Sequence, residues 1–520
     1  MVNYRPIAAT SLLLTNNCQA GDRNLAFFVV RCRCLKGGEA SHLLGQSTIG
    51  LKPFGTGVNG WRPICVVKRL RSLTHFGSEN LAWRKNNFWP KGVSNDNMQT
   101  EVSLHEDYLT YLPESIIETV LTKLPLRDAV RTSILSSKWR YKWATLTHIE
   151  FDDNRVSETH DRSLLDTNFV KFICRFFLLH DGPINKFALS TYNLYIWSVL
   201  DQWLFILYRK DVKELVLDLH VCAGWLPSFL FSCQKLVHLE LFRWWSPNLP
   251  LSFKGFPFLK HLNLQDFSIA SDAIQNLISG SPLLESLNLL YYNGLELTVH
   301  SPYLKFLTLE GMIKDIHLEN NPKLVAITVN MYMTEDIAAH FGQISCCTFD
   351  KFLGDAPCLQ RLIGRGYFAE YMSIGNTFGK TEMKYQQLKV IELSEVNFEN
   401  MKQIMVVLRL ILNSPNLEEL QIVGLSASLS ALEPPDLDFW ENECHFDCTL
   451  ERLKMVKMMD MFGVPHEVGF IGFLLGNSPL LETMSITPTE DMTGDISSFF
   501  IELRRLQRAS TKAELIFGEN

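Results

Sequence analysis

The sequence predicts an α/β protein in which a small three-helix module is followed by an irregular solenoid, with parallel strands on the inner face and helices outside. Three observations lead to this fold. An apolar triplet spaced as L-x-x-L-x-L recurs between residues 184 and 486, several copies have a proline two positions before the first leucine, and helix-like segments lie between copies. Because one such unit cannot bury its apolar face alone, we expect neighbouring units to stack over a continuous core.

The charge is distributed unevenly along the 520-residue chain. Residues 1–98 hold 13 Lys and Arg against 4 Asp and Glu, which leaves 36 against 52 in the remainder, a net charge of −16. Because phosphate neutralisation needs clustered cations, the acidic remainder argues against nucleic-acid binding. The 47% hydrophobic content supports a large core, yet no apolar run reaches the ~20 residues that span a bilayer, so we expect no membrane segment.

The sequence offers little for catalysis or metal binding. Twelve cysteines are scattered without the paired spacing of a zinc site, which favours free thiols in a reducing compartment. Cys444, His445 and Cys448 come nearest to a metal cluster but lack a second ligand pair. The sequence contains no glycine-rich phosphate loop and no zinc-protease or serine-hydrolase motif. We therefore expect no metal, no cofactor and no enzymatic activity.

Residues 1–100 show neither a helical nor an alternating apolar period and are rich in Gly, Asn and Ser. This composition predicts a basic, mostly disordered extension. The scarcity of acids also suits an organelle transit peptide or a basic binding arm, and both alternatives stay open.

Residues 111–145 predict three short helices. The apolar stripe of the first helix consists of Ile117, Val120, Leu121 and Leu124. Pro125 ends that helix, and Trp139 and Trp143 lie four residues apart on the third. We expect helices this small to leave much of their apolar surface for a partner. The alternative is a minor helical subdomain that fills its own core.

The order Leu-Pro, Leu-Pro again, Asp-Ala-Val-Arg-Thr-Ser, Leu-Ser, Trp-Arg and a final Trp resembles the F-box of plant F-box proteins, and we place this module at residues 105–150. The resemblance implies docking onto a Skp-type linker protein, which joins an F-box protein to a cullin-based ubiquitin ligase. The residues that it implies for this interface are Leu112, Pro113, Ile117, Leu121, Leu124, Pro125, Val130, Leu135 and Trp139. Ser137 and Lys138 stand where many relatives carry Lys-Arg, but the apolar positions are intact.

The apolar triplets continue through residues 151–431 and beyond at intervals of about 20 to 35 residues. Their first residues are Ile184, Val212, Leu236, Leu259, Leu284, Leu304, Leu324, Leu388, Leu417, Leu450 and Leu481, and Leu359 starts a degenerate copy that ends in Gly364. The prolines are expected to stop the preceding segment and lead directly into a strand. The helices between copies are clearest at residues 272–278, 402–412 and 467–475.

These repeats resemble the degenerate leucine-rich repeats of plant F-box proteins. Residues 432–517 resemble the FBD domain that follows such repeats, on the evidence of FDCTLERLKMVKMMDMFGVPHEVGFIGFLLGNSPLLETMSI and LRRLQRASTKAELIF. In L-x-x-L-x-L the leucines point inward, so the intervening residues share the opposite face of the sheet. The candidate target-binding residues on that face are His238, Glu240, Phe242, His261, Asn263, Phe306 and Thr308.

Together the resemblances imply a substrate-recognition adaptor of an SCF-type (Skp, cullin, F-box) E3 ubiquitin ligase in the nucleus or cytoplasm. Its F-box would bind the linker, and through it the cullin, while the repeats hold a target protein for ubiquitination. Two alternatives remain: a non-degradative F-box scaffold or repeat-based protein-interaction module, and a small-ligand sensor.

Overall fold

The computed structural model describes residues 111–152, 162–192, 194–220, 224–245, 249–250, 252–267, 269–332, 352–353, 356–373, 385–425, 439–440, 449–490 and 496–518. The predictions for residues 1–100, and the Cys444, His445 and Cys448 group, lie outside this part of the chain. Within it, no helix is both long enough and apolar enough to cross a membrane.

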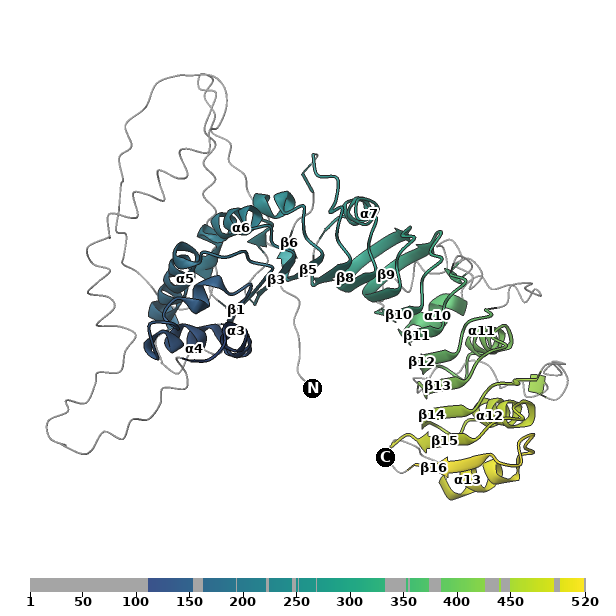
Figure 1. Ribbon diagram of the computed structural model, residues 1–520. Coiled ribbons are helices and arrows are strands. Elements are labelled where there is room, and N and C mark those ends of the chain that lie inside the picture. Colours follow the sequence, from purple (N-terminus) through teal and green to yellow (C-terminus); the bar gives the residue numbers. More distant parts are fainter. Residues whose placement is uncertain are drawn as a thin grey trace, which may run out of the picture. The chain divides into compact units, whose positions relative to one another are not determined.

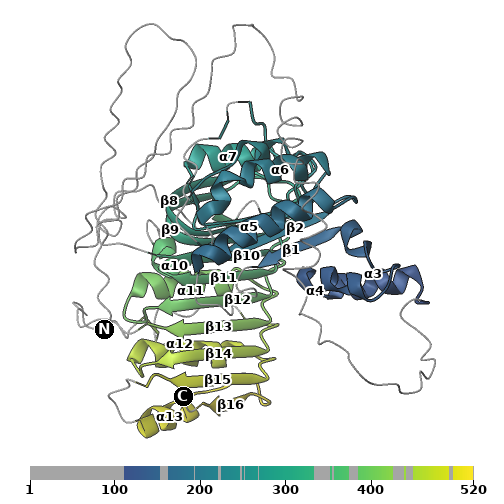
Figure 2. The ribbon, with the colours of Figure 1, turned by 90° about the vertical axis from the view of Figure 1, so that its left-hand side faces the viewer.

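A single 14-stranded sheet runs through the described part, and its strands neighbour one another in the order in which they occur along the chain. Every printed pair is parallel, and Figure 2 shows β10 to β16 as a stack of parallel arrows. The strands are β1 (His148–Asp152), β2 (Lys186–Thr191), β3 (Glu214–Leu219), β5 (His238–Phe242), β7 (His261–Gln265), β8 (Ser286–Val299), β9 (Phe306–Leu318), β10 (Ala326–Met331), β11 (Arg361–Gly366), β12 (Val390–Val396), β13 (Glu419–Gly424), β14 (Met455–Met461), β15 (Thr483–Pro488) and β16 (Glu514–Phe517). Two short strands, β4 (Gly224–Trp225) and β6 (Trp244–Trp245), pair separately.

Helices cover one side of this sheet, and Figure 1 shows α6, α7, α11 and α12 on the outer side of its curve. The α-helices are α3 (Glu114–Lys123), α4 (Leu126–Arg131), α5 (Arg162–Leu179), α6 (Leu200–Arg209), α7 (Ser271–Ser279), α10 (Phe368–Ser373), α11 (Met401–Leu412), α12 (Pro465–Asn477) and α13 (Ile496–Arg505). Short 3-10 helices occur at η2 (Thr132–Ile134), η3 (Lys142–Thr145), η5 (Leu194–Ser198) and η6 (Ser228–Ser232). The three interrepeat helices predicted from sequence are confirmed as α7, α11 and α12.

The core is built from the apolar triplets, as predicted. In β8, for example, Leu287 and Leu289 are fully buried, whereas their neighbours Ser286 and Asn288 remain partly exposed. In the degenerate copy in β11, the following helix α10 compensates for the missing third leucine. A Cβ atom added to Gly364 would lie 2.1 Å from the Phe368 ring, so this ring from α10 fills the volume that a leucine side chain takes elsewhere.

The prediction that each proline leads directly into a strand is wrong in detail. Ser281 precedes Pro282 and is fully buried, its hydroxyl donates to the Leu277 carbonyl (2.8 Å), and its own carbonyl accepts from Leu284 N (3.1 Å). The strand begins only at Ser286. Pro282 therefore lies in a turn that ends helix α7. The buried Ser281 makes its hydrogen bonds within this turn, as a buried polar group must.

The expectation of a helix in every repeat is wrong for β8 and β9. These strands run for 14 and 13 residues and stay paired to their ends, where a helix was expected. Their second halves alternate buried and exposed residues, as at Leu295, Glu296 and Leu297. That period of two suits a strand and cannot produce a helical stripe.

The third predicted helix of the N-terminal module is also corrected. Trp139 lies in a turn, and only the 3-10 helix η3 follows before β1 begins at His148. β1 straddles the predicted boundary at residue 150 and pairs with β2, so the helical module continues into the first strand of the large sheet.

Glu467, in the first turn of α12, predicts a pH dependence of stability. Its buried carboxylate accepts the backbone N–H groups of Phe462, Gly463 and Val464 at 2.7–3.3 Å. Burial outweighs these bonds and raises its pKa from 4.5 to about 7. As the pH rises from 4.5 to about 7, the unfolded chain releases this proton while the folded chain keeps it, so the free energy of unfolding should fall by an amount on the order of 3 kcal/mol.

The substitution Glu467→Gln keeps this position neutral at every pH. In urea unfolding at about pH 5 and about pH 8, the variant should therefore lack the decrease in the free energy of unfolding that Glu467 causes in the parent protein. An identical pH dependence in both proteins would contradict the assignment.

Candidate functional site

The N-terminal helical module divides its apolar residues between an inner and an outer side. Ile117, Leu121 and Trp139 are at most 2% exposed. These three therefore form the module's own core, and their direct contact with the linker stays a prediction. They are buried because α4 packs against α3, η3 and β1, and strand β1 supplies cover that three isolated helices would lack.

The outer side still carries exposed apolar residues. Pro113, Pro125 and Leu135 are exposed as predicted, while Leu112, Leu124 and Val130 are partly buried and pack against the core. Further exposed apolar residues on the module are Tyr111, Ile116, Val120, Ile134 and Tyr141. Ile116 and Val120 lie four residues apart on one side of α3, and Ile117 and Leu121 lie four residues apart on its buried side. We call these exposed and partly buried residues together the outer F-box surface.

The module is held firmly against the first repeats. The Trp143 ring packs 5.9 Å from Phe176 of α5, and Asp181 N donates to the Ala144 carbonyl (2.9 Å). His180 Nε2 lies 2.8 Å from the Leu146 carbonyl. Burial lowers the pKa of His180, so a neutral ring donates this bond from Nε2. The pairing of β1 with β2 adds backbone hydrogen bonds between the module and the first repeats.

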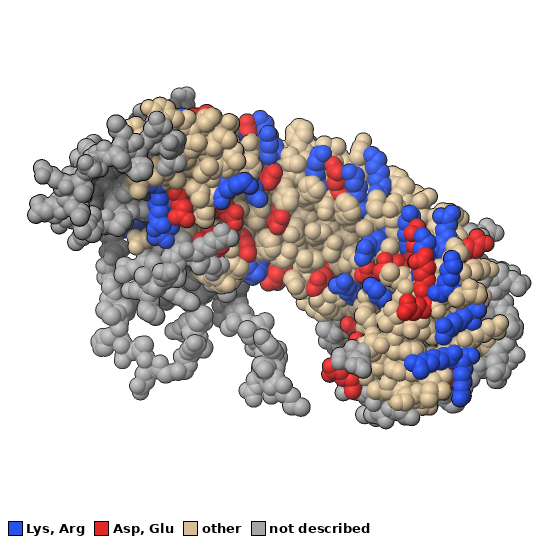
Figure 3. Space-filling model, turned by 60° about the horizontal axis from the view of Figure 1, so that its bottom comes forward, with Lys and Arg blue, Asp and Glu red and all other residues tan. Residues whose placement is uncertain are grey.

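The seven candidate target-binding residues share the sheet face opposite α6, α7, α11 and α12, and none of them is buried. The register places His238 beside His261, and Glu240 beside Asn263. Phe306 and Thr308 lie on β9, two strands beyond β7. The face that Figure 3 displays has Lys and Arg interspersed with Asp and Glu over the repeats, a pattern that suits proteins better than polyanions.

The part of this face on β5 and β7 is a hydrogen-bonded ladder. His238 Nε2 lies 2.6 Å from Glu240 Oε1, Asn263 Nδ2 donates to Glu240 Oε2 (3.4 Å), and Gln265 donates to Asn263 (3.3 Å). The bond to His238 lowers the pKa of Glu240, while partial burial and His238 lower the pKa of His261. These groups already satisfy one another, so they offer a preformed polar surface.

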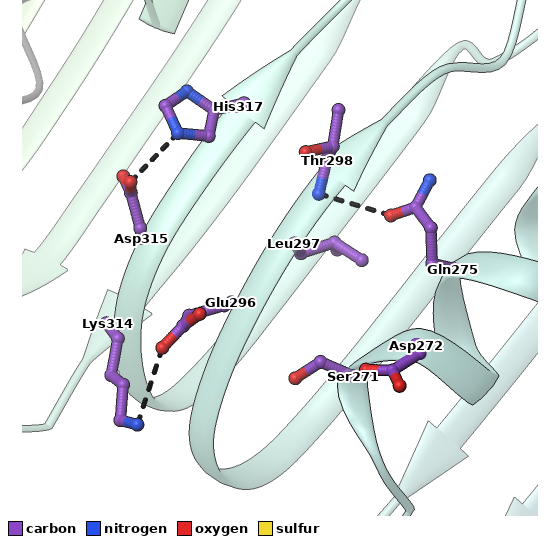
Figure 4. A pocket seen from close by; sticks show the side chains of 9 residues that line it. All are labelled: Ser271, Asp272, Gln275, Glu296, Leu297, Thr298, Lys314, Asp315 and His317. Carbon is purple, nitrogen blue, oxygen red and sulfur yellow. Dashed lines mark hydrogen bonds and ion pairs between the residues drawn. The ribbon is translucent and has the colours of Figure 1, made fainter.

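A hollow of about 640 Å³ lies where α7 meets the second halves of β8 and β9 (Figure 4). Lys314 faces Glu296 across the strands (3.4 Å), and His317 Nε2 lies 2.8 Å from Asp315. Thr298 N donates to the Gln275 side chain (3.2 Å). Because most of its polar groups bind one another and its walls are open to solvent, this hollow is a weak ligand site.

A helical docking module continued by a parallel sheet of leucine-rich repeats defines the class of F-box proteins with leucine-rich repeats. A model of the F-box domain matches residues 109–148, one described as "FBD-associated F-box protein At5g56370, LRR repeats" matches residues 200–422, and an FBD model matches residues 441–486. None of the three is a catalytic domain. F-box domains generally bind Skp-type linker proteins.

The similarity to one plant relative extends over most of this chain. F-box/FBD/LRR-repeat protein At1g13570 of Arabidopsis thaliana is 46% identical over 412 residues, covering 79% of this chain and 98% of the relative. F-box/FBD/LRR-repeat protein At1g51370 of the same plant is 32% identical over 242 residues, covering 45% of this chain and 53% of the relative. The chain belongs to the F-box/FBD/LRR-repeat family.

Proposed function

We propose that this protein is the substrate-recognition adaptor of an SCF-type ubiquitin ligase, acting without catalysis of its own in the nucleus or cytoplasm. The outer F-box surface would bind a Skp-type linker, and the open sheet face would bind the target protein. We assign residues 105–150 to the F-box, 151–431 to the repeats and 432–517 to the FBD domain. The observation that carries the proposal is the exposure of apolar residues on a module whose core is already complete, because such a surface is typical of a docking site.

The fixed junction between module and repeats supports the same proposal. An adaptor contributes proximity and orientation, and both require that the linker site and the target site keep a defined geometry. The β1–β2 pair and the packing of Trp143 on Phe176 provide that rigidity. The candidate target residues His238, Glu240, Phe242, His261, Asn263, Phe306 and Thr308 stay part of this proposal.

The proposal is tested by Ile134→Glu combined with Leu135→Glu. These residues are 58% and 44% exposed, so charges there should leave the fold intact. Placed in an apolar interface, two charges should lower the affinity for a Skp-type linker at least about 100-fold, or ~2.7 kcal/mol. Calorimetric titration of the full chain with purified linker measures this.

A matched control is Leu480→Glu combined with Ile501→Glu, two exposed apolar residues within residues 432–517. This pair should bind the linker with unchanged affinity. Equal linker affinity in both double variants would show that the outer F-box surface is not the docking site.

A further inference from the structure

Exposed aromatic side chains occur on or directly after four consecutive strands of the sheet. Tyr291 of β8 is 56% exposed, Phe306 of β9 is 50% exposed, and Tyr332 and Tyr367, which follow β10 and β11, are 40% and 39% exposed. Tyr332 and Tyr367 occupy equivalent positions, because their amides donate to the carbonyls of Gly311 and Met331 on the preceding strands. Phe306 pairs with Ala326, six positions before Tyr332, so it lies toward the opposite end of the strands from the three tyrosines. We call Tyr291, Tyr332, Tyr367 and Arg365 the central aromatic patch.

Small residues leave the Phe306 ring accessible from both sides. Its register partners are Ser286 on β8 and Ala326 on β10, and neither side chain is long enough to cover an aromatic ring. A ring held on a rigid strand with open flanks is a typical anchor for apolar side chains of a bound peptide.

Tyr332 is held in place before any partner binds. Its hydroxyl donates to Glu310, and Asn330 Nδ2 donates to the same hydroxyl (3.3 Å). Burial and the nearby carboxylate raise the pKa of Tyr332 to about 12, so the hydroxyl keeps its proton. Because the ring is already ordered, binding to it costs less conformational entropy.

Arg365 gives the patch its charge preference. On the same strand, Arg361 is neutralised by an ion pair with Glu392 of β12. Arg365 is exposed and lies beside Asn330, and no carboxylate among the described residues is within ion-pair distance of it. An unneutralised guanidinium next to ordered aromatic rings favours a ligand that brings its own carboxylate.

We propose that the central aromatic patch binds an extended segment of a target protein in which an acidic side chain is flanked by proline or other apolar residues. The carboxylate would pair with Arg365, the apolar residues beside it would pack on Tyr332 and Tyr367, and residues further along the extended segment would reach Phe306. This inference rests on the proposed function and adds the chemistry of the target to it.

The test uses the full chain and displayed random linear peptides as the probe. The selected peptides should be enriched in Asp or Glu beside Pro or aromatic residues, and Arg365→Gln and Tyr332→Ala should each weaken the best peptides at least tenfold. The matched control Arg361→Gln, on the same strand but paired with Glu392, should bind them as the parent does. Peptides without acidic enrichment, or equal losses in Arg365→Gln and Arg361→Gln, would overturn the proposal.

Linker titration of the same variants separates the two proposals. The F-box surface is unchanged in them, so linker affinity should be unchanged. Selective peptide capture without linker binding would contradict the adaptor function and support peptide binding at the patch. Linker binding without selective peptide capture would contradict peptide binding at the patch alone.

Discussion

Replacing Leu287 with Asp should unfold the repeats around β8. Leu287 is fully buried, and its register partners Leu262 and Leu307 are also buried. The substitution removes an apolar side chain that contributes about 2–5 kcal/mol and leaves a carboxylate without a partner in the core, so the total loss should exceed about 4 kcal/mol. Because stacked repeats support one another, the loss should extend to neighbouring strands. Hydrogen exchange of the β7 to β10 amides measures this directly.

Asn288→Ala is the control for this prediction. Asn288 follows Leu287 in the same strand but lies on the open face, partly exposed. Its removal should change stability by no more than about 0.5 kcal/mol. If the two variants lose exchange protection equally, the assignment of inward and outward residues in β8 is wrong.

Replacing Trp139 with Ala should unfold the helical module and, as a consequence, abolish linker binding. Trp139 is 2% exposed and among the largest fully buried side chains of the described chain. Large-to-small changes of this kind cost about 3–5 kcal/mol, and a module this small holds little stability in reserve. We expect exchange protection to be lost in α3 and α4 and retained in β12 to β15.

Tyr141→Ala is the control for Trp139→Ala, because it removes an exposed aromatic side chain and not a buried one. Tyr141 is 57% exposed and lies two residues from Trp139, so its loss should leave the module folded. A folded Trp139→Ala variant that fails to bind the linker would instead place Trp139 at the interface. That outcome would restore the direct contact that its burial argues against.

The repeated part of the fold was predictable from the sequence alone. The side chains of Leu284, Leu287 and Leu289 are buried, and their alternation with polar residues is visible in the sequence. The parallel sheet follows because each such strand needs a neighbouring strand. The F-box motif was similarly recognisable, because its proline and tryptophan positions are local features. Both are properties of short segments that do not depend on distant contacts.

The tertiary structure decided which side chains of each segment face the core and which neighbours they contact. The spacing of Ile116, Ile117, Val120 and Leu121 predicts a helix, but only packing against α4 and η3 shows that Ile117 and Leu121 face inward. Similarly, Arg361 and Arg365 look alike in the sequence, and their difference appears only when the register places Glu392 within reach of Arg361. Local spacing determines the period of an element, whereas the identity of its neighbours depends on residues far away in the chain.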